Sequence, residues 1–209
     1  MNLVILLICL VLGYLLGSLN TSVIVSRMKG KDIRTVGSGN AGATNTLRVM
    51  GKGMAALVLV CDVLKAIVAV LLAKLYFHFF PSEYADIGVL LAGFGAILGH
   101  NFPLYFGFRG GKGVATSFGA ILILDWRIAL IILGVFIVVV ALTRYVSLAS
   151  CLAAVAVIVS ACFLRPTVWE MLLFAAIAVL CILRHKTNIG RLIKGTENKL
   201  GQKKKEETV

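Results

Sequence analysis

Residues 99–116 read GHNFPLYFGFRGGKGVAT and lie between two long apolar runs. Five glycines, His100, Arg109 and Lys112 fall within this stretch. Because ordering a glycine costs much conformational entropy, the glycines around Lys112 indicate backbone N–H groups turned toward a ligand that approaches closely. Beside a lysine, that ligand is expected to be an anion. A tight turn whose lysine faces lipid headgroups is the alternative interpretation of GGKG by itself.

The spacing of this stretch excludes a nucleotide-binding P-loop. That motif needs a glycine separated by four residues from the Gly-Lys pair and a serine or threonine directly after the pair. Phe106 and Gly113 occupy those two places.

The composition places almost the whole chain in a membrane. Hydrophobic residues make up 60% of the 209 residues, and the mean hydropathy is +0.99, which is far above the range of soluble proteins. The net charge of +12 must therefore collect in loops, where it sets topology and attracts anionic lipid or substrate. Nucleic acid is not an expected partner.

Apolar runs predict seven helices, at residues 3–25, 54–80, 86–106, 114–124, 128–143, 147–164 and 168–184. The fourth is shorter than the roughly 20 residues that a perpendicular span needs. It forms either one kinked span with the fifth, broken at residues 125–127, or a short span of its own.

The loop charges favour the second alternative. If residues 125–127 face the outside, seventeen Lys and Arg residues share one side, while the other side carries only Lys74, Arg127 and Arg165. By the positive-inside rule, we predict an all-α polytopic membrane protein with seven transmembrane helices, its N-terminus outside and its C-terminus cytoplasmic. Residues 1–200 are expected to form one integral membrane domain, and 201–209 a disordered basic and acidic cytoplasmic tail.

Small residues at helix-packing spacing occur in two of these runs, as Gly13-x3-Gly17 and Gly95-x3-Gly99. We interpret them as close helix contacts. The first run has no basic region ahead of it and no convincing cleavage site, so we expect a retained span and not a signal peptide.

The first polar loop, residues 36–53, reads VGSGNAGATNTLRVMGKG. Gly37-x-Gly39-x-x-Gly42 formally matches a dinucleotide fingerprint, but no strand precedes it and no βαβ unit is possible. What remains is a set of hydrogen-bonding groups and one guanidinium fork suited to phosphate. They come from the glycines, Ser38, Asn40, Thr44, Asn45 and Arg48.

The last polar loop, residues 184–199, reads RHKTNIGRLIKGTENK. Arg191 and Lys194 fit a basic amphipathic helix that lies on anionic lipid. His185 and Asn188 are three residues apart at the end of a span, so they share a helix face and can converge on one ligand group.

The three loops GSGNAGATN with Arg48, GHNFP with FRGGKGVAT, and HKTNIGRLIKGTENK resemble the signature motifs of the PlsY family, membrane glycerol-3-phosphate acyltransferases that use acyl phosphate. The resemblance covers the whole chain. It implies transfer of an acyl group from acyl phosphate to glycerol 3-phosphate, giving 1-acyl-glycerol-3-phosphate in bacterial phospholipid synthesis. It also implies a multi-pass protein of the bacterial inner membrane, with an active site that faces the cytoplasm.

The resemblance also implies roles for particular residues. Ser38 and Arg48 would be required for activity, and Lys112, His185 and Asn188 would contact the phosphate-bearing substrate. The remaining expected substrate-binding residues are Gly37, Gly39, Asn40, Gly42, Thr44, Asn45, His100, Gly110, Gly111, Gly113 and Ser150. Glu197 is expected to be structural, and Ser147 is the alternative to Ser150.

The chemistry agrees with these residue types. An acyl phosphate is an activated mixed anhydride, so its reaction needs alignment and stabilisation of the leaving phosphate more than a strong catalyst. No histidine on the expected cytoplasmic side is followed five positions later by aspartate, and all five cysteines lie in apolar runs. We therefore expect no acyl-enzyme, no metal and no cofactor, and we expect the substrate's own phosphate to accept the proton.

Two other classes of protein remain as alternatives. A small transporter for a phosphorylated solute would explain the basic loops and would make Asp62 and Lys65 a coupling pair. Against it, no inverted repeat is apparent, and the polar glycine clusters lie on one face of the membrane. A lipid-binding scaffold leaves the serine, asparagine and histidine residues unexplained. The expected partners are thus acyl phosphate, glycerol 3-phosphate and the bilayer, with the protein as a monomer.

Overall fold

The computed structural model describes residues 2–165 and 167–202, and all regular structure in these residues is helical. In chain order the elements are α1 (Asn2–Gly17), α2 (Thr21–Met28), α3 (Ala43–Met50), α4 (Lys52–Phe79), α5 (Ala85–Asn101), η1 (Leu104–Phe106), α6 (Val114–Leu124), α7 (Trp126–Thr143), α8 (Val146–Leu164), α9 (Val168–Arg184) and α10 (Lys186–Ile193). Of the predicted tail 201–209, residues 203–209 lie outside the described part.

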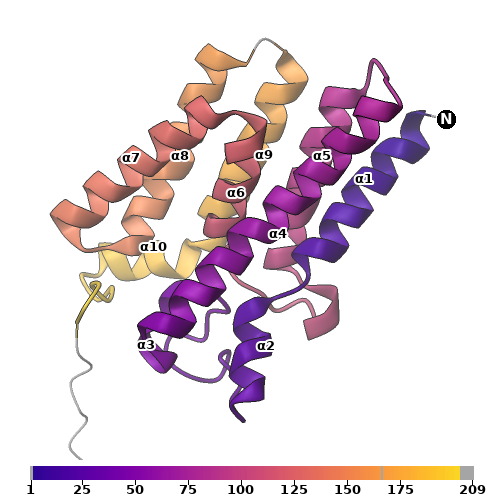
Figure 1. Ribbon diagram of the computed structural model, residues 1–209. Coiled ribbons are helices and arrows are strands. Elements are labelled where there is room, and N and C mark those ends of the chain that lie inside the picture. The colour runs from indigo at the N-terminus through magenta and orange to yellow at the C-terminus, as the bar shows by residue number, and fades with distance from the viewer. Residues whose placement is uncertain (1, 166, 203–209) are drawn as a thin grey trace, which may run out of the picture.

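The connections gather at the two ends of the helix bundle (Figure 1). The α4–α5, α6–α7 and α8–α9 connections lie at the end where α1 begins. The longer loops, together with α2, α3 and α10, lie at the opposite end. All three motif-bearing segments therefore share one end of the molecule, as the sequence predicts.

The structure is that of an integral membrane protein. Five candidate spans are long and apolar enough to cross a bilayer: 3–28, 52–79, 85–106, 126–143 and 146–164. α9 and α10 qualify only together and bend by 57° between them, and α6 is a shorter apolar helix. Large apolar side chains such as Leu142 and Phe163 point outward from the bundle, where lipid replaces water as the solvent.

The first apolar run, predicted as one helix over 3–25, is interrupted between α1 and α2. Asn20 caps α2: its Oδ1 accepts hydrogen bonds from the backbone N–H of Val23 at 3.2 Å and from Ser22 Oγ at 2.8 Å. An asparagine at an N-cap satisfies a backbone donor that the helix leaves free. The chain can therefore change direction here without exposing an unpaired N–H.

Close packing of α1 on α5 confirms the interpretation of the small residues. A methyl group on Gly13 or Gly17 would collide with the backbone carbonyl of Ala92 or Ala96. Seen from the other helix, a methyl group on Gly95 or Gly99 would collide with backbone atoms of α1. The two backbones are in contact because neither helix carries a Cβ at these positions.

The predicted break between the fourth and fifth helices is confirmed, and it is one residue long. Asp125 caps α7 by accepting from the N–H of Arg127 at 3.0 Å. Its Oδ2 also lies 2.9 Å from Arg127 Nη2 and 3.2 Å from Arg165 Nη1. These ion pairs join the α6–α7 turn to the end of α8.

Candidate functional site

A cavity of about 360 Å³ lies between the loops at the α3 and α10 end and continues among α6, α7, α8 and α9. One part of its lining is polar and the other is apolar. The polar lining comprises Ser38, Asn40, Thr44, Asn45, Arg48, Asp62, His100, Lys112, Ser117, Ser147, Ser150, His185, Asn188, Glu197 and Asn198.

Twelve of the sixteen predicted site residues line this one cavity. They come from all three motifs, so the fold brings together segments that are far apart in the sequence. The four that do not line it are Gly37, Gly39, Gly110 and Gly111.

Glu197 organises the last loop around the cavity. Its Oε1 accepts hydrogen bonds from Asn188 Nδ2 at 2.6 Å and from Ser147 Oγ at 2.9 Å, and its Oε2 accepts from Arg191 Nε at 2.6 Å. Asn188 in turn accepts a hydrogen bond from Lys112 Nζ through Oδ1. The amide of Asn188 is thus held in one orientation by a donor on one side and a carboxylate on the other.

The electrostatics of Glu197 and Lys112 follow from these contacts. Burial opposes ionisation of Glu197, but its hydrogen bonds from Asn188, Arg191 and Ser147 together hold its pKa below the usual value. Burial lowers the pKa of Lys112 to about 8, against the opposing attraction of Glu197. At neutral pH Lys112 is therefore mainly a cation, in a place from which water is partly excluded.

His185 lies buried where α9 ends and α10 begins. Its Nδ1 is 2.8 Å from the backbone carbonyl of Cys181, and a carbonyl can only accept a hydrogen bond. Nδ1 therefore carries hydrogen, and Nε2 is the nitrogen left for a ligand. His185 and Asn188 both line the cavity, so they converge as predicted, although α9 and α10 are two helices at an angle.

Asn45 fixes the shape of the first loop. Its Oδ1 accepts from the N–H of Ser38 at 2.8 Å, while its Nδ2 donates to the carbonyls of Ile33 and Val36, both at 3.0 Å. Both amide N–H groups are engaged within the protein, which gives Asn45 a structural role. Gly37 and Gly39 have φ values of +64° and +70°, so they are needed for the turn itself.

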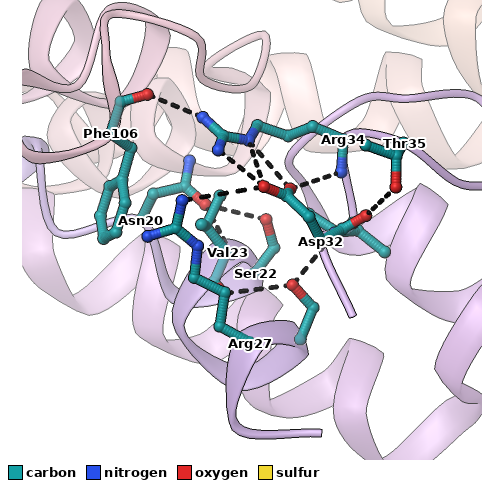
Figure 2. Close-up of polar contacts among 10 residues, drawn as sticks. Asn20, Ser22, Val23, Arg27, Asp32, Arg34, Thr35 and Phe106 are labelled. Carbon is teal, nitrogen blue, oxygen red and sulfur yellow. Dashed lines mark hydrogen bonds and ion pairs between the residues drawn. The ribbon is translucent and has the colours of Figure 1, made fainter. Parts of the chain in front are cut away.

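Arg34, just ahead of the first polar loop, connects that loop to the stretch at residues 99–116 (Figure 2). Its Nη2 lies 2.7 Å from Asp32 Oδ2, and its Nη1 donates to the carbonyl of Phe106 at 2.7 Å. This hydrogen-bonded guanidinium holds the pKa of Asp32 at about 2. The loop that carries Ser38 is thereby attached to the start of residues 107–113, which we call the glycine-rich loop.

The glycine-rich loop is held mainly through its carbonyl groups. Arg184 donates to the carbonyl of Gly111 at 2.8 and 3.1 Å and to that of Gly110 at 3.4 Å. The N–H of Gly111 donates to the carbonyl of His100 at 3.1 Å. The expectation that this N–H faces a ligand is therefore wrong, because it has a partner within the protein.

Both candidate serines of α8 line the cavity. Ser150 Oγ donates to the carbonyl of Val146 at 2.8 Å, within its own helix, whereas Ser147 Oγ donates to Glu197. Arg191, which the sequence assigns to a lipid-facing helix surface, donates through Nε to Glu197, and its side chain is 39% exposed. Sequence reasoning also missed Arg184, because nothing in a run of basic residues marks the one that reaches another loop.

Comparisons with known proteins find relatives that match almost the whole chain. The glycerol-3-phosphate acyltransferase family model matches residues 7–195. Glycerol-3-phosphate acyltransferase from Trichormus variabilis is 45% identical, over 95% of this chain and 93% of the relative; the enzyme of Shouchella clausii is 50% identical, over 91% and 94%.

Two solved structures are also similar to this chain. Both are of PlsY, an integral membrane glycerol 3-phosphate acyltransferase. Its glycerol 3-phosphate form has a TM-score of 0.86 and 36% identity, covering 94% of this chain and 96% of that one. Its lysophosphatidic acid form has a TM-score of 0.83 and 35% identity, with coverages of 94% and 95%.

Proposed function

This chain belongs to the glycerol-3-phosphate acyltransferase family, and from that premise we propose that it transfers an acyl group from acyl phosphate to glycerol 3-phosphate. The C1 hydroxyl oxygen of glycerol 3-phosphate attacks the acyl carbonyl carbon, and the bond between that carbon and the phosphate oxygen breaks. The products are 1-acyl-glycerol-3-phosphate and inorganic phosphate.

The observation that carries this proposal is the composition of the cavity. Its polar part holds Lys112 and Arg48, which suits anionic phosphate groups. Its apolar part suits an acyl chain, because burying methylene groups is favourable. The apolar lining includes Phe118, Ile121, Ile132, Leu133, Phe136, Ala153, Ala154, Val157, Ile177 and Ala178.

The residue roles are those that the family resemblance implies, and the cavity lining is compatible with them. Lys112, His185 and Asn188 hold the phosphate-bearing substrate, and the glycine-rich loop helps to hold acyl phosphate. Arg48 is exposed on α3 with no hydrogen-bond partner among the described residues, so its guanidinium is available for substrate phosphate. Ser38 and Ser150 contribute hydroxyl groups, and Glu197 is structural through the contacts described above.

The proton of the attacking hydroxyl goes to a phosphate oxygen of the substrate. A phosphate monoester has a second pKa of about 6 by analogy with phosphoserine, and it lies within intramolecular reach of its own hydroxyl. In this mechanism the protein aligns the two substrates and stabilises the departing phosphate. Because Nδ1 of His185 is used by the carbonyl of Cys181, Nε2 can donate to phosphate only when the ring is protonated. A bound phosphate anion favours that form, so His185 orients the phosphate as an imidazolium and is not an obligatory base.

The site faces the cytoplasm in a seven-span arrangement with the N-terminus outside. α6 is then a short span packed inside the bundle, and the basic loops all lie at the cavity end (Figure 1). We propose that the protein functions as a monomer. Cysteines placed singly at Ser82 and Thr196 should react with a membrane-impermeant reagent from opposite sides; equal sidedness would rule out this topology.

Turnover by the purified protein in detergent tests the activity. With glycerol 3-phosphate and acyl phosphate we expect 1-acyl-glycerol-3-phosphate and stoichiometric phosphate, and much slower product formation with an acyl thioester as donor. Because detergent leaves no second compartment, product formation excludes a transporter. Faster reaction with the thioester would overturn the choice of donor, and absence of product with both donors would overturn the proposed activity.

A further inference from the structure

Three buried titratable side chains meet beside the cavity, and two of them line it. Asp62 and Lys65 are one helical turn apart on α4, and His100 lies near the end of α5. Their exposed fractions are 1%, 8% and 3%. Asp62 and His100 contribute to the cavity lining. The reaction proposed above uses neither Asp62 nor Lys65.

Lys65 Nζ is surrounded by three atoms that can accept a hydrogen bond. It lies 2.9 Å from Asp62 Oδ1, 3.1 Å from the carbonyl oxygen of Leu19 and 2.9 Å from His100 Nδ1. A buried carboxylate is stable as an anion only when a positive charge compensates it. Lys65 is therefore an ammonium group, which has three N–H bonds and no lone pair.

This arrangement determines the tautomer of His100. Because the Lys65 ammonium can only donate, Nδ1 of His100 must present its lone pair at 2.9 Å, and the ring hydrogen is then on Nε2. The opposite tautomer would point an N–H at an ammonium. An Nδ1–H could instead donate to Asp62 Oδ1, but the distance between His100 Nδ1 and that oxygen is 3.4 Å, which is longer than an ordinary N–H···O hydrogen bond.

The Nε2 side of the ring faces the glycine-rich loop. A methyl group on Gly111 would collide with His100 Nε2, and the backbone carbonyl of His100 accepts the N–H of Gly111 at 3.1 Å. Within residues 2–165 and 167–202, no protein atom accepts a hydrogen bond from Nε2. An N–H that has no acceptor within the protein can donate to a ligand in the cavity, which His100 lines.

We infer that His100 is a hydrogen-bond donor, through Nε2–H, to an anionic oxygen of the substrate, and that Lys65 and Asp62 are positioning residues that fix its tautomer. His100 then complements Lys112, which follows Gly111 in the same loop. Contact of Lys65 with Leu19 also attaches this group to the α1–α2 break. The inference deepens the proposed function, on which its substrate contact rests.

Nitrogen NMR of the full-length protein, labelled with 15N-histidine in detergent, tests the tautomer without reference to activity. The spectra of His78→Gln and His185→Gln assign the remaining signals to His100. We expect a protonated Nε2 and an unprotonated Nδ1 in the unsubstituted protein. In Lys65→Met, Nδ1 should become protonated, because Asp62 is then its only partner. A protonated Nδ1 in the unsubstituted protein would overturn the inference.

Steady-state kinetics of His100→Phe and His100→Gln test the donor role. The glutamine amide offers an acceptor toward Lys65 and a donor toward the cavity, whereas phenylalanine offers neither. We expect kcat/KM to fall at least tenfold in His100→Phe and to recover most of that loss in His100→Gln. His78→Gln, at an exposed histidine of α4, is the matched control and should keep full activity.

The results separate this inference from the activity itself. Equal losses in the glutamine and phenylalanine variants, with unchanged thermal unfolding, would show that no donated hydrogen bond is needed and would overturn the donor role. An unsubstituted protein that forms no product would overturn the proposed function, while the NMR spectrum would still decide the tautomer.

Discussion

Ser147 and Glu197 are fifty residues apart in sequence, yet Ser147 Oγ donates a hydrogen bond to Glu197 Oε1 at 2.9 Å inside the cavity. This contact joins α8 to the segment that follows α10. Two further hydrogen bonds connect the same segments. The N–H of Leu200 donates to the carbonyl of Arg144 at 2.7 Å, and Arg144 Nη2 donates to the carbonyl of Leu200 at 2.8 Å. The C-terminal segment is therefore part of the site wall.

Replacing Glu197 with glutamine should lower both stability and activity. The variant keeps the shape but turns one acceptor oxygen into an NH2 group that faces other donors, and it removes the charge that pairs with Arg191. Hydrogen bonds to a charged group contribute about 1.5–3 kcal/mol. Thermal unfolding in detergent should shift down by several degrees, and kcat should fall. Glu83→Gln, at an exposed glutamate, is the control; an unchanged unfolding temperature in Glu197→Gln would contradict the structural role.

Activity should depend on the charge of Lys112. Because burial lowers its pKa to about 8, the group is an ammonium below that pH and a neutral amine above it. We expect kcat/KM to decline as the pH rises through about 8, a limb that reports the free enzyme. In Lys112→Arg the guanidinium stays charged, so this limb should move to higher pH even if the rate is lower. An identical limb in both proteins would assign it to another group.

Arg48→Lys keeps the charge but loses the planar pair of donors. If Arg48 binds phosphate through two parallel hydrogen bonds, kcat/KM should fall at least about tenfold, which corresponds to roughly 1.4 kcal/mol of transition-state stabilisation. Arg109→Lys, at an exposed arginine that does not line the cavity, should have little effect. Full activity of Arg48→Lys would show that Arg48 contributes only to membrane topology and not to phosphate binding.

His185→Gln distinguishes substrate-assisted transfer from catalysis by a histidine base. The amide can still donate a hydrogen bond to phosphate, but it cannot accept the proton. We expect a measurable kcat with a raised KM for glycerol 3-phosphate. A loss of about three orders of magnitude or more in kcat, with substrate still bound normally, would identify His185 as the base, since that is the scale of general-base contributions.

The contact between α1 and α5 predicts a position-specific effect of a single methyl group. Gly17→Ala would push against the backbone carbonyl of Ala96 and should destabilise the protein by about 1–3 kcal/mol. Gly134→Ala, on α7, meets nothing within 4 Å and should be neutral or stabilising, since alanine favours helices. Thermal unfolding of the two variants in detergent checks this contrast. Equal effects would mean that α1 and α5 can separate without cost.

The helical segments were predictable because a bilayer imposes long apolar runs, and these runs can be read directly from the chain. Each of the seven predicted runs contains a helix, and the turn at residue 125 falls where its charged residues indicate. The break at Asn20 was missed because it lies inside an apolar run. At this break the side chain of Asn20 caps α2, and hydropathy does not reveal a capping hydrogen bond.

Some residues of the site could be named in advance and others could not. Ser38, Arg48, Lys112, His185 and Asn188 stand out because their motifs are rich in glycine and polar groups, and all five line the cavity. The motifs could not show which polar residues serve the fold. Asn45, for example, holds the first loop through its own amide.

By itself, the sequence determined the membrane class, the helical segments, the family and the group of loops that lines the cavity. These properties follow from hydropathy, charge and motif spacing, which are local along the chain. Only the tertiary structure decided that His100 meets Asp62 and Lys65, and that Glu197 meets Ser147. Such contacts join segments from distant parts of the sequence, and a buried charge is stable only beside the partner that packing brings to it.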